Sequence, residues 1–242
     1  MERQISARAE SLQASQRQFL KYTFFKVDPL WRRLDKDEIA SSKLQFGSIV
    51  KTYAANHTLK TYSLVGIRGD ADFMFWTISE RLEDFQEFTS RLLSSKLGRY
   101  LAIPYSYLAM TRPSEYLGGH RHEGQEGATP RRLPGDSKYL FVYPFTKKRE
   151  WYSLPNEERK RMMQEHFKIG HKYPSVKINT GYSFGLDDQE FMLSFETDSP
   201  ADFSDLVMEL RTSEASRYTA LETPIFTCIA MDIEQALDLL AN

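Results

Sequence analysis

Two stretches of this chain resemble each other, and their spacing sets the expected architecture. Sliding the 242-residue sequence against itself by 118 positions aligns residues 72–100 with residues 190–218 without a gap. Eight of the 29 aligned positions are identical, where composition alone would give about two. The identical pairs are Phe73/Phe191, Met74/Met192, Asp84/Asp202, Phe85/Phe203, Leu92/Leu210, Ser95/Ser213, Arg99/Arg217 and Tyr100/Tyr218. We therefore expect two copies of one folding unit.

The two copies have the same order of expected strands and helices. In each copy an apolar, β-rich stretch precedes a helix whose apolar residues recur at 3.6-residue spacing. The expected elements, paired by copy, are opening strands 19–27 and 139–145, helices 37–54 and 155–173, apolar stretches 64–78 and 182–195, and closing strands 105–111 and 224–231. Each half then has the order β-α-β-β-α-β, which is the ferredoxin-like arrangement.

This order predicts an α+β fold. Two tandem ferredoxin-like halves would bring their antiparallel sheets together as a dimeric α+β barrel within one chain. We expect an N-terminal half at 1–117, a Gly-rich linker loop at 118–136 and a C-terminal half at 137–242. The loop contains five of the 12 glycines and two of the five histidines. Such a composition is typical of a mobile linker, but it also suits a lid that places His120 or His122 over a pocket.

Composition narrows the possible functions. Lys and Arg number 32 against 33 Asp and Glu, a formal charge of -1, so we expect no large basic surface for nucleic acid. Cys228 is the only cysteine, which excludes intramolecular disulfides, iron-sulfur clusters held by this chain and Cys-rich zinc sites. The first 18 residues are polar, and no apolar run is long enough to span a bilayer. We therefore expect a cytoplasmic protein without a membrane span.

His166 is the histidine whose position is most informative. On the expected helix, Met162, His166, Ile169 and Tyr173 fall on one face, so the imidazole should point inward. A lone histidine on an apolar face is more often a hydrogen-bonded core residue than a ligand. A neutral imidazole in an apolar cleft is nevertheless what a proximal haem ligand requires. The 118-residue offset pairs His166 with Ser48, which indicates a single site per chain, in the second half.

A second group of residues lies just ahead of that helix. Tyr143 ends an aromatic strand, and the cations Lys147, Lys148 and Arg149 precede Trp151. Strand aromatics usually pack in a core, and such a run of cations is usually a solvated turn. The same combination also suits an aromatic ligand with carboxylates, because cations neutralise the acids while aromatic faces cover the ring.

The segments around these residues resemble a known family. Tyr-Pro-Phe-Thr-Lys, Glu-Trp-Tyr, Leu-Pro-Asn-Glu-Glu-Arg, Met-Met-Gln-Glu-His and Tyr-Pro-Ser-Val-Lys-Ile-Asn-Thr are similar to the chlorite dismutase-like superfamily, specifically its actinobacterial-type coproheme decarboxylases. The resemblance runs from about residue 18 to residue 231 and is most specific between 143 and 195. It implies a homopentamer whose subunits have two ferredoxin-like halves and bind haem in the second half.

The resemblance also implies roles for individual residues. His166 matches the proximal iron ligand, and Tyr143 matches the tyrosine whose radical takes a hydrogen atom from a propionate arm. Lys147 matches the basic residue near the propionates, and Trp151 matches the pocket tryptophan. Arg217 is a further, less secure anchor for the acids.

Two positions on the opposite face of the haem complete the implied site. His120 matches the distal histidine that deprotonates peroxide, with His122 as a competitor because the Gly-rich insertion is long. Ile178 aligns where chlorite dismutases carry an arginine and Firmicutes-type decarboxylases a glutamine. Since isoleucine cannot stabilise an oxychlorine anion, chlorite conversion is disfavoured.

The function implied is peroxide-dependent oxidative decarboxylation of coproheme to haem b in haem biosynthesis. The implied partners are coproheme, hydrogen peroxide and further copies of the chain. Two other hypotheses remain open at this point. One is a haem-binding protein with only weak peroxidase activity, and the other is a haem-free oligomeric scaffold.

Overall fold

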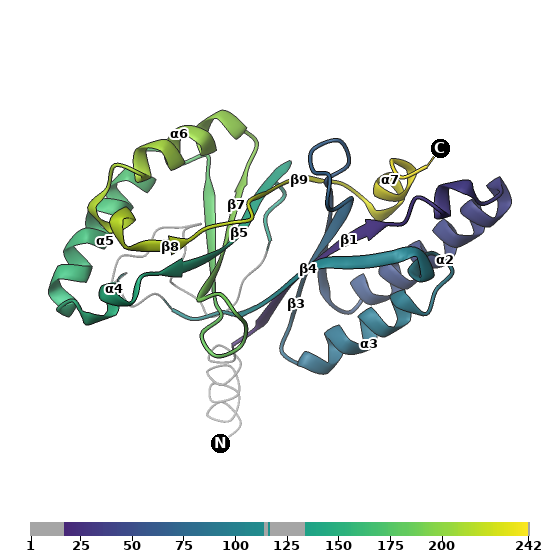
Figure 1. Cartoon of the computed structure of the whole chain (residues 1–242), viewed down its shortest axis with the longest axis horizontal. Coiled ribbons are helices and arrows are strands. Elements are labelled where there is room, and N and C mark those ends of the chain that lie inside the picture. Colours follow the sequence, from purple (N-terminus) through teal and green to yellow (C-terminus); the bar gives the residue numbers. More distant parts are fainter. Residues whose placement is uncertain (1–16, 114–115, 117–133, 242) are drawn as a thin grey trace, which may run out of the picture. The chain divides into compact units, whose positions relative to one another are not determined.

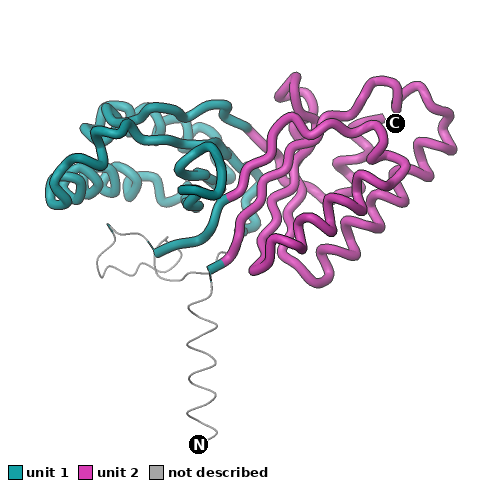
Figure 2. Tube along the Cα trace, turned by 60° about the horizontal axis from the view of Figure 1, so that its bottom comes forward, with its two compact units in different colours: residues 1–17, 109–226 teal, residues 18–108, 227–242 magenta. Residues whose placement is uncertain are grey.

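The computed structural model describes residues 17–113, 116 and 134–241, and these residues form two compact units (Figure 2). Unit 2 combines residues 18–108 with 227–242, and unit 1 contains residues 109–226. The chain thus builds most of unit 2 first and returns to it at its end. The domain boundaries expected at 117 and 137 stay a prediction, because residues 117–133 lie outside the described part. No helix in that part is both long and apolar enough to cross a membrane.

Unit 2 is an antiparallel sheet with helices on one face (Figure 1). Its elements are β1 (Phe19–Val27), α2 (Lys36–Ala54), β2 (Thr58–Ser63), β3 (Phe73–Ser79), α3 (Leu82–Leu93), β4 (Leu101–Met110), β9 (Phe226–Ala230) and α7 (Ile233–Asp238), with short 3₁₀ helices at Trp31–Arg33 and Leu97–Tyr100. Neighbouring strands follow the order β4-β1-β3-β2-β9. Phe46 of α2 and Phe88 of α3 pack against Phe25, Phe73 and Phe75 of the sheet in one continuous core.

Unit 1 repeats this plan. Its elements are β5 (Tyr139–Lys147), α4 (Arg149–Ser153), α5 (Asn156–Gly170), β6 (Lys177–Tyr182), β7 (Phe191–Thr197), α6 (Pro200–Leu210), the 3₁₀ helix η3 (Glu214–Tyr218) and β8 (Thr219–Leu221). β5 pairs antiparallel with β7 and β8, and β6 pairs antiparallel with β7. The strand order is therefore β8-β5-β7-β6, which places the fourth, first, third and second strands of the unit side by side as in β4-β1-β3-β2.

The α+β class with antiparallel sheets is confirmed, and a strand is present where the second half was expected to close. Residues 224–231 were expected to close the second half. The strand found there is β9, and one of its edges pairs with β2 through Tyr62↔Ala230 and Ser63↔Ile229. The three-residue strand β8 precedes β9 and pairs with the end of β5 through Thr146↔Leu221 and Lys147↔Thr219. The strand β8 was not expected, because a three-residue strand directly after a 3₁₀ helix shows little alternation of apolar and polar residues.

The number of residues that separates equivalent positions of the two units changes along the chain. The position in unit 2 that is equivalent to His166 therefore differs from the expected one. β1 and β5 are both nine residues long and begin 120 positions apart, as do α2 and α5. His166 is therefore equivalent to Phe46, and the expected pairing with Ser48 is wrong. The ungapped offset of 118 holds for β3 and β7 but does not extend back to the first helix of each unit.

Candidate functional site

The equivalent positions of the two units differ where the sequence places its candidate residues. Unit 2 has the apolar core residues Val27, Trp31 and Phe46. Unit 1 has Lys147, Trp151 and His166 at the positions 120 residues later. A continuous apolar core in one copy is thus interrupted by a cation and an imidazole in the other. Ionisable side chains at positions that form a core lower the stability of the fold, so they are expected where a function requires them. This difference between the units therefore locates the candidate site.

The core of unit 1 is accordingly divided into two clusters. One contains Tyr143 with Phe141, Phe195, Ile169 and Phe203, among others. The other contains Trp151, Met162 and Ala215, with Tyr116 and Tyr218 packed at its edge. The helix α5 contributes to both, through Ile169 and Met162 respectively. His166 lies between these two residues along α5.

His166 is held as a neutral imidazole. α5 starts directly after Pro155 and has Glu157 and Glu158 in its first turn, which favours helix formation there. His166 is half-buried, and burial together with the nearby charge of Lys147 lowers its pKa to about 4. Within the described residues no hydrogen bond occupies the ring. At neutral pH the imidazole therefore has a lone pair available for a ligand.

Lys147 is a cation in a partly desolvated position. Its Nζ donates to the carbonyl oxygen of Ala215 (2.8 Å) and lies 4.5 Å from the centroid of the Trp151 ring. Burial lowers the pKa of this ammonium to about 8, an effect that the carboxylate of Glu190 opposes. One donor of three is used on Ala215, so the others can reach an acidic ligand.

Glu190 was missed by the sequence reasoning. The residue is 7% exposed, and its carboxylate accepts hydrogen bonds from the backbone N–H of Lys147 (2.8 Å) and the hydroxyl of Tyr152 (2.6 Å). The internal repeat could have indicated this role of Glu190. Asp72, at the same place in the other copy, accepts from the backbone N–H of Val27 (2.8 Å). An acidic residue before each Phe-Met pair thus fixes the last residue of each opening strand.

We expect Glu190→Ala to lower the free energy of unfolding by about 2–4 kcal/mol, because two partly buried donors lose a charged acceptor. Urea unfolding measures the change. Glu87→Ala removes an exposed carboxylate from α3 and should stay within about 0.5 kcal/mol of the parent. Equal losses in the two variants would contradict the role given to Glu190.

Tyr143 lies in the layer between the β5-β7-β6 sheet and the helices. Its side chain is 7% exposed and its ring stacks on Phe195, with centroids 5.7 Å apart. Burial raises the pKa of the phenol above its ordinary value of 10.0, so the hydroxyl keeps its proton at every physiological pH. It can supply a hydrogen atom but not a standing negative charge.

The other candidate residues are placed less centrally. Ile178 on β6 is half-buried, pairs with Phe195 and packs against the Tyr143 cluster. Arg217 on η3 is exposed, and within the described residues no hydrogen bond or ion pair joins it to the others. His120 and His122 fall among residues 117–133 and so lie outside the described part of the chain.

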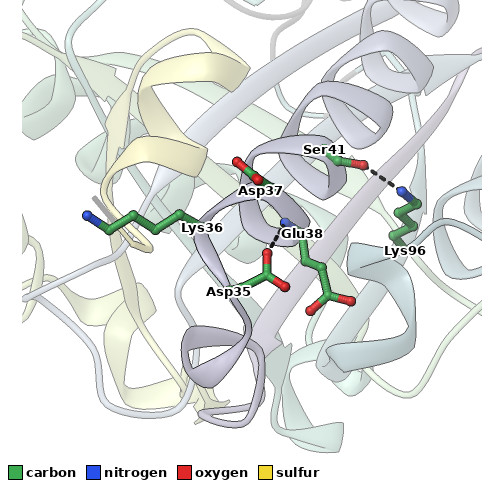
Figure 3. A pocket seen from close by; sticks show the side chains of 6 residues that line it. All are labelled: Asp35, Lys36, Asp37, Glu38, Ser41 and Lys96. Atoms are coloured by element: carbon green, nitrogen blue, oxygen red, sulfur yellow. Dashed lines mark hydrogen bonds between the residues drawn. The ribbon is translucent and has the colours of Figure 1, made fainter.

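A depression in unit 2 has a different character (Figure 3). It is open to solvent and lined by Asp35, Lys36, Asp37, Glu38, Ser41 and Lys96. Asp35 caps α2 by accepting from the N–H of Glu38 (2.8 Å), and Lys96 donates to Ser41 (2.6 Å). These two hydrogen bonds lie around a helix start and none of the lining side chains is aromatic, so the depression does not suit a flat ligand.

The possible metal ligands in unit 1 suit a metal ion that is already coordinated by a macrocycle. In the described ranges no group of three or more His, Cys, Asp or Glu side chains could hold a bare metal ion. A single neutral imidazole beside aromatic faces and a cation can instead bind a metal already held in a macrocycle with acidic arms. The residues present therefore fit an iron tetrapyrrole.

Comparison with known proteins gives matches of three kinds. The family model described as chlorite dismutase matches residues 39–231. The coproheme decarboxylase of Mycolicibacterium smegmatis is 36% identical over 179 residues, which cover 73% of this chain and 74% of the relative. Among solved structures, chlorite dismutase from Candidatus Nitrospira defluvii in complex with imidazole gives a TM-score of 0.83 at 25% identity, covering 96% of this chain and 98% of the other.

A fourth match concerns the fold alone. A protein of Thermus thermophilus, described as a novel heme-binding protein, gives a TM-score of 0.80 at 23% identity and covers 92% of this chain and 94% of its own. Proteins of several descriptions thus share this architecture, and the distinction between them has to come from the side chains of the site.

Proposed function

This chain belongs to the chlorite dismutase family, and from that premise we propose that it is a haem-dependent enzyme that converts coproheme to haem b in haem biosynthesis. The observation that carries the proposal is the substitution within the repeat. Val27 and Phe46 of the packed core in unit 2 become Lys147 and His166 in unit 1. A neutral imidazole and a desolvated ammonium at such positions match an iron centre with carboxylate arms.

In this proposal His166 binds the ferric iron of coproheme through its neutral ring. Lys147 holds a propionate, Trp151 covers part of the macrocycle, and Arg217 reaches a second acid from the exposed surface of η3. When bound, the iron macrocycle supplies the oxidising power drawn from hydrogen peroxide. The distal base that takes the proton of peroxide is assigned to His120, with His122 as the competitor.

Tyr143 carries the hydrogen transfer. It gives up its hydroxyl hydrogen and then takes a hydrogen atom from the β-carbon of a propionate, which regenerates the phenol. The substrate radical loses one further electron as CO2 leaves, and a vinyl group remains. The two electrons, the proton of the β-hydrogen and one proton from solvent together account for the reduction of one peroxide to two water molecules. Two such rounds give haem b.

Chlorite conversion is disfavoured by the same site. Ile178 offers neither a charge nor a hydrogen-bond donor, and it packs into the Tyr143 cluster. An oxychlorine anion at this position would lack electrostatic stabilisation. The ammonium of Lys147 would instead neutralise a carboxylate of the proposed substrate.

We further propose that each unit is a ferredoxin-like copy, which the shared strand orders β4-β1-β3-β2 and β8-β5-β7-β6 support. The proposal includes a cytoplasmic homo-oligomer of five copies, as the resemblance implies.

Lys147→Gln is expected to weaken ferric coproheme binding roughly 10- to 100-fold at pH 7, because a charge-assisted hydrogen bond is lost. The pKa of Lys147 is about 8. The ammonium is therefore charged below pH 8, and the affinity of the parent protein should fall as pH rises through 8. This fall should be absent in the variant. Lys148→Gln, at an exposed neighbour, is the matched control, and absorbance titrations from pH 6 to 9 measure the effect.

One experiment tests the proposed function as a whole. The recombinant protein is titrated with ferric coproheme and then with hydrogen peroxide, while absorbance and mass spectrometry follow the pigment. Stepwise loss of two carboxyl groups supports the enzyme. Bleaching without vinyl formation points to a haem-binding protein without turnover, and failure to bind points to a scaffold.

A further inference from the structure

Arg159 on α5 has a buried N–H without a partner. In the described residues three buried side-chain polar atoms lack any hydrogen bond, namely Tyr53 Oη, Trp76 Nε1 and Arg159 Nε. Only Arg159 is charged, and only Arg159 belongs to unit 1. A guanidinium N–H removed from water without an acceptor is unfavourable, so this atom is in place for a partner that the chain itself does not supply.

The position of Arg159 on α5 relates it to the candidate site. It precedes His166 by seven residues, which is about 20° short of two full helical turns and about 10.5 Å along the axis. Both side chains therefore lie on one face of α5. Between them Met162 is fully buried against Trp151, and the ring of Trp151 lies 4.5 Å from Lys147 Nζ.

The two basic residues that follow Arg159 on α5 are either paired or exposed to solvent. Arg161 is exposed and forms an ion pair with Glu214 (2.8 Å). Lys160 is exposed on the solvent side of the helix. Arg159 alone on this helix combines a positive charge with a buried, unpartnered donor. Its guanidinium offers two parallel N–H groups that match the two oxygens of a carboxylate.

We infer that Arg159 binds a carboxylate arm of the ligand that His166 and Lys147 hold, as an additional specificity residue of the site. The inference rests on the proposed function. Arg159 and His166 are about two turns apart on one face of α5, roughly 10.5 Å along the axis, so the two side chains can contact different parts of one large ligand. Lys147 and Arg159 would then anchor two different arms and favour a substrate with more than one propionate.

Affinity measurements test this inference without relying on turnover. Ferric coproheme III and its tetramethyl ester are titrated into the parent protein, Arg159→Gln, Arg159→Lys and the control Lys160→Gln. We expect Arg159→Gln to weaken coproheme binding roughly 10- to 100-fold, with partial recovery in Arg159→Lys. Lys160→Gln should change binding less than twofold, and the ester should bind all four proteins alike. Equal affinities in the Gln variants, or the same loss with the ester, would overturn the inference.

Stability without ligand separates this role from a structural one. Because Nε has no partner in the protein, Arg159→Gln should unfold at the same urea concentration as the parent protein or a higher one. A lower midpoint together with unchanged coproheme affinity would identify Arg159 as a structural residue and overturn the inference. If the parent protein does not bind coproheme, the proposed function fails and this inference fails with it. If the parent binds and Arg159→Gln binds equally well, only the inference fails.

Discussion

Tyr143→Phe is expected to abolish CO2 release from bound coproheme, with a loss of at least about 1,000-fold in the rate of vinyl formation, while coproheme binding changes less than threefold. The substitution removes only the hydroxyl that exchanges hydrogen with the propionate. The ring keeps its stack on Phe195 (5.7 Å) and its place in the apolar cluster, so packing should be preserved. A rate loss of this size corresponds to about 4 kcal/mol of transition-state stabilisation.

The state of the Tyr143 proton adds a second expectation. Burial raises the pKa of the phenol above 10.0, so the neutral form persists as pH rises through the range where an exposed tyrosine would ionise. Ionisation of Tyr143 should therefore produce no fall in rate below pH 10. Tyr139→Phe is the matched control, since Tyr139 packs at the edge of the same cluster on the same strand. Product masses after peroxide addition give the readout, and decarboxylation by Tyr143→Phe at the rate of Tyr139→Phe would refute the assignment.

The strands and helices were largely predictable because they depend on local sequence patterns. The strand Phe19–Val27 and the start of the helix at 36 follow from apolar periodicity and capping, since Asp35 accepts from the N–H of Glu38. The position of β9 within residues 224–231 was also predictable, but its pairing with β2 was not. Its pairing with β2 joins residues more than 160 positions apart, and no property of 226–230 alone specifies which sheet it completes.

The candidate residues of the site could be named from the sequence, but their arrangement could not. Lys147, Trp151 and His166 were found from their chemistry and from the resemblance. Glu190 was missed because it is not identical to Asp72, although both carboxylates fix the end of an opening strand. Arg159 was missed because periodicity marks the apolar face of a helix, and a buried donor without a partner can only be recognised from coordinates.

His166→Ala is expected to remove iron coordination and to weaken ferric coproheme binding more than about 100-fold, because the substitution deletes the imidazole proposed as the iron ligand. Metal-free coproporphyrin III is the discriminating probe. Its acidic arms still meet Lys147, so its affinity should change less than threefold. His171→Ala, at the exposed end of α5, should leave both ligands bound as in the parent protein.

The low pKa of His166 also determines the lowest pH at which its ring should coordinate the iron of coproheme. The imidazole has a pKa of about 4 in the folded chain against 6.5 for the free side chain. It is neutral and able to coordinate iron down to about pH 5, and coordination should be lost only below that value. The unfolded chain takes up the proton first, so folding stability should fall as pH drops from 6.5 towards 4. His166→Phe, which copies Phe46 of the other unit, should fold without this acid sensitivity. Urea unfolding at pH 7 and pH 5 compares the two proteins, and an equal loss of stability in both would show that the acid sensitivity arises elsewhere.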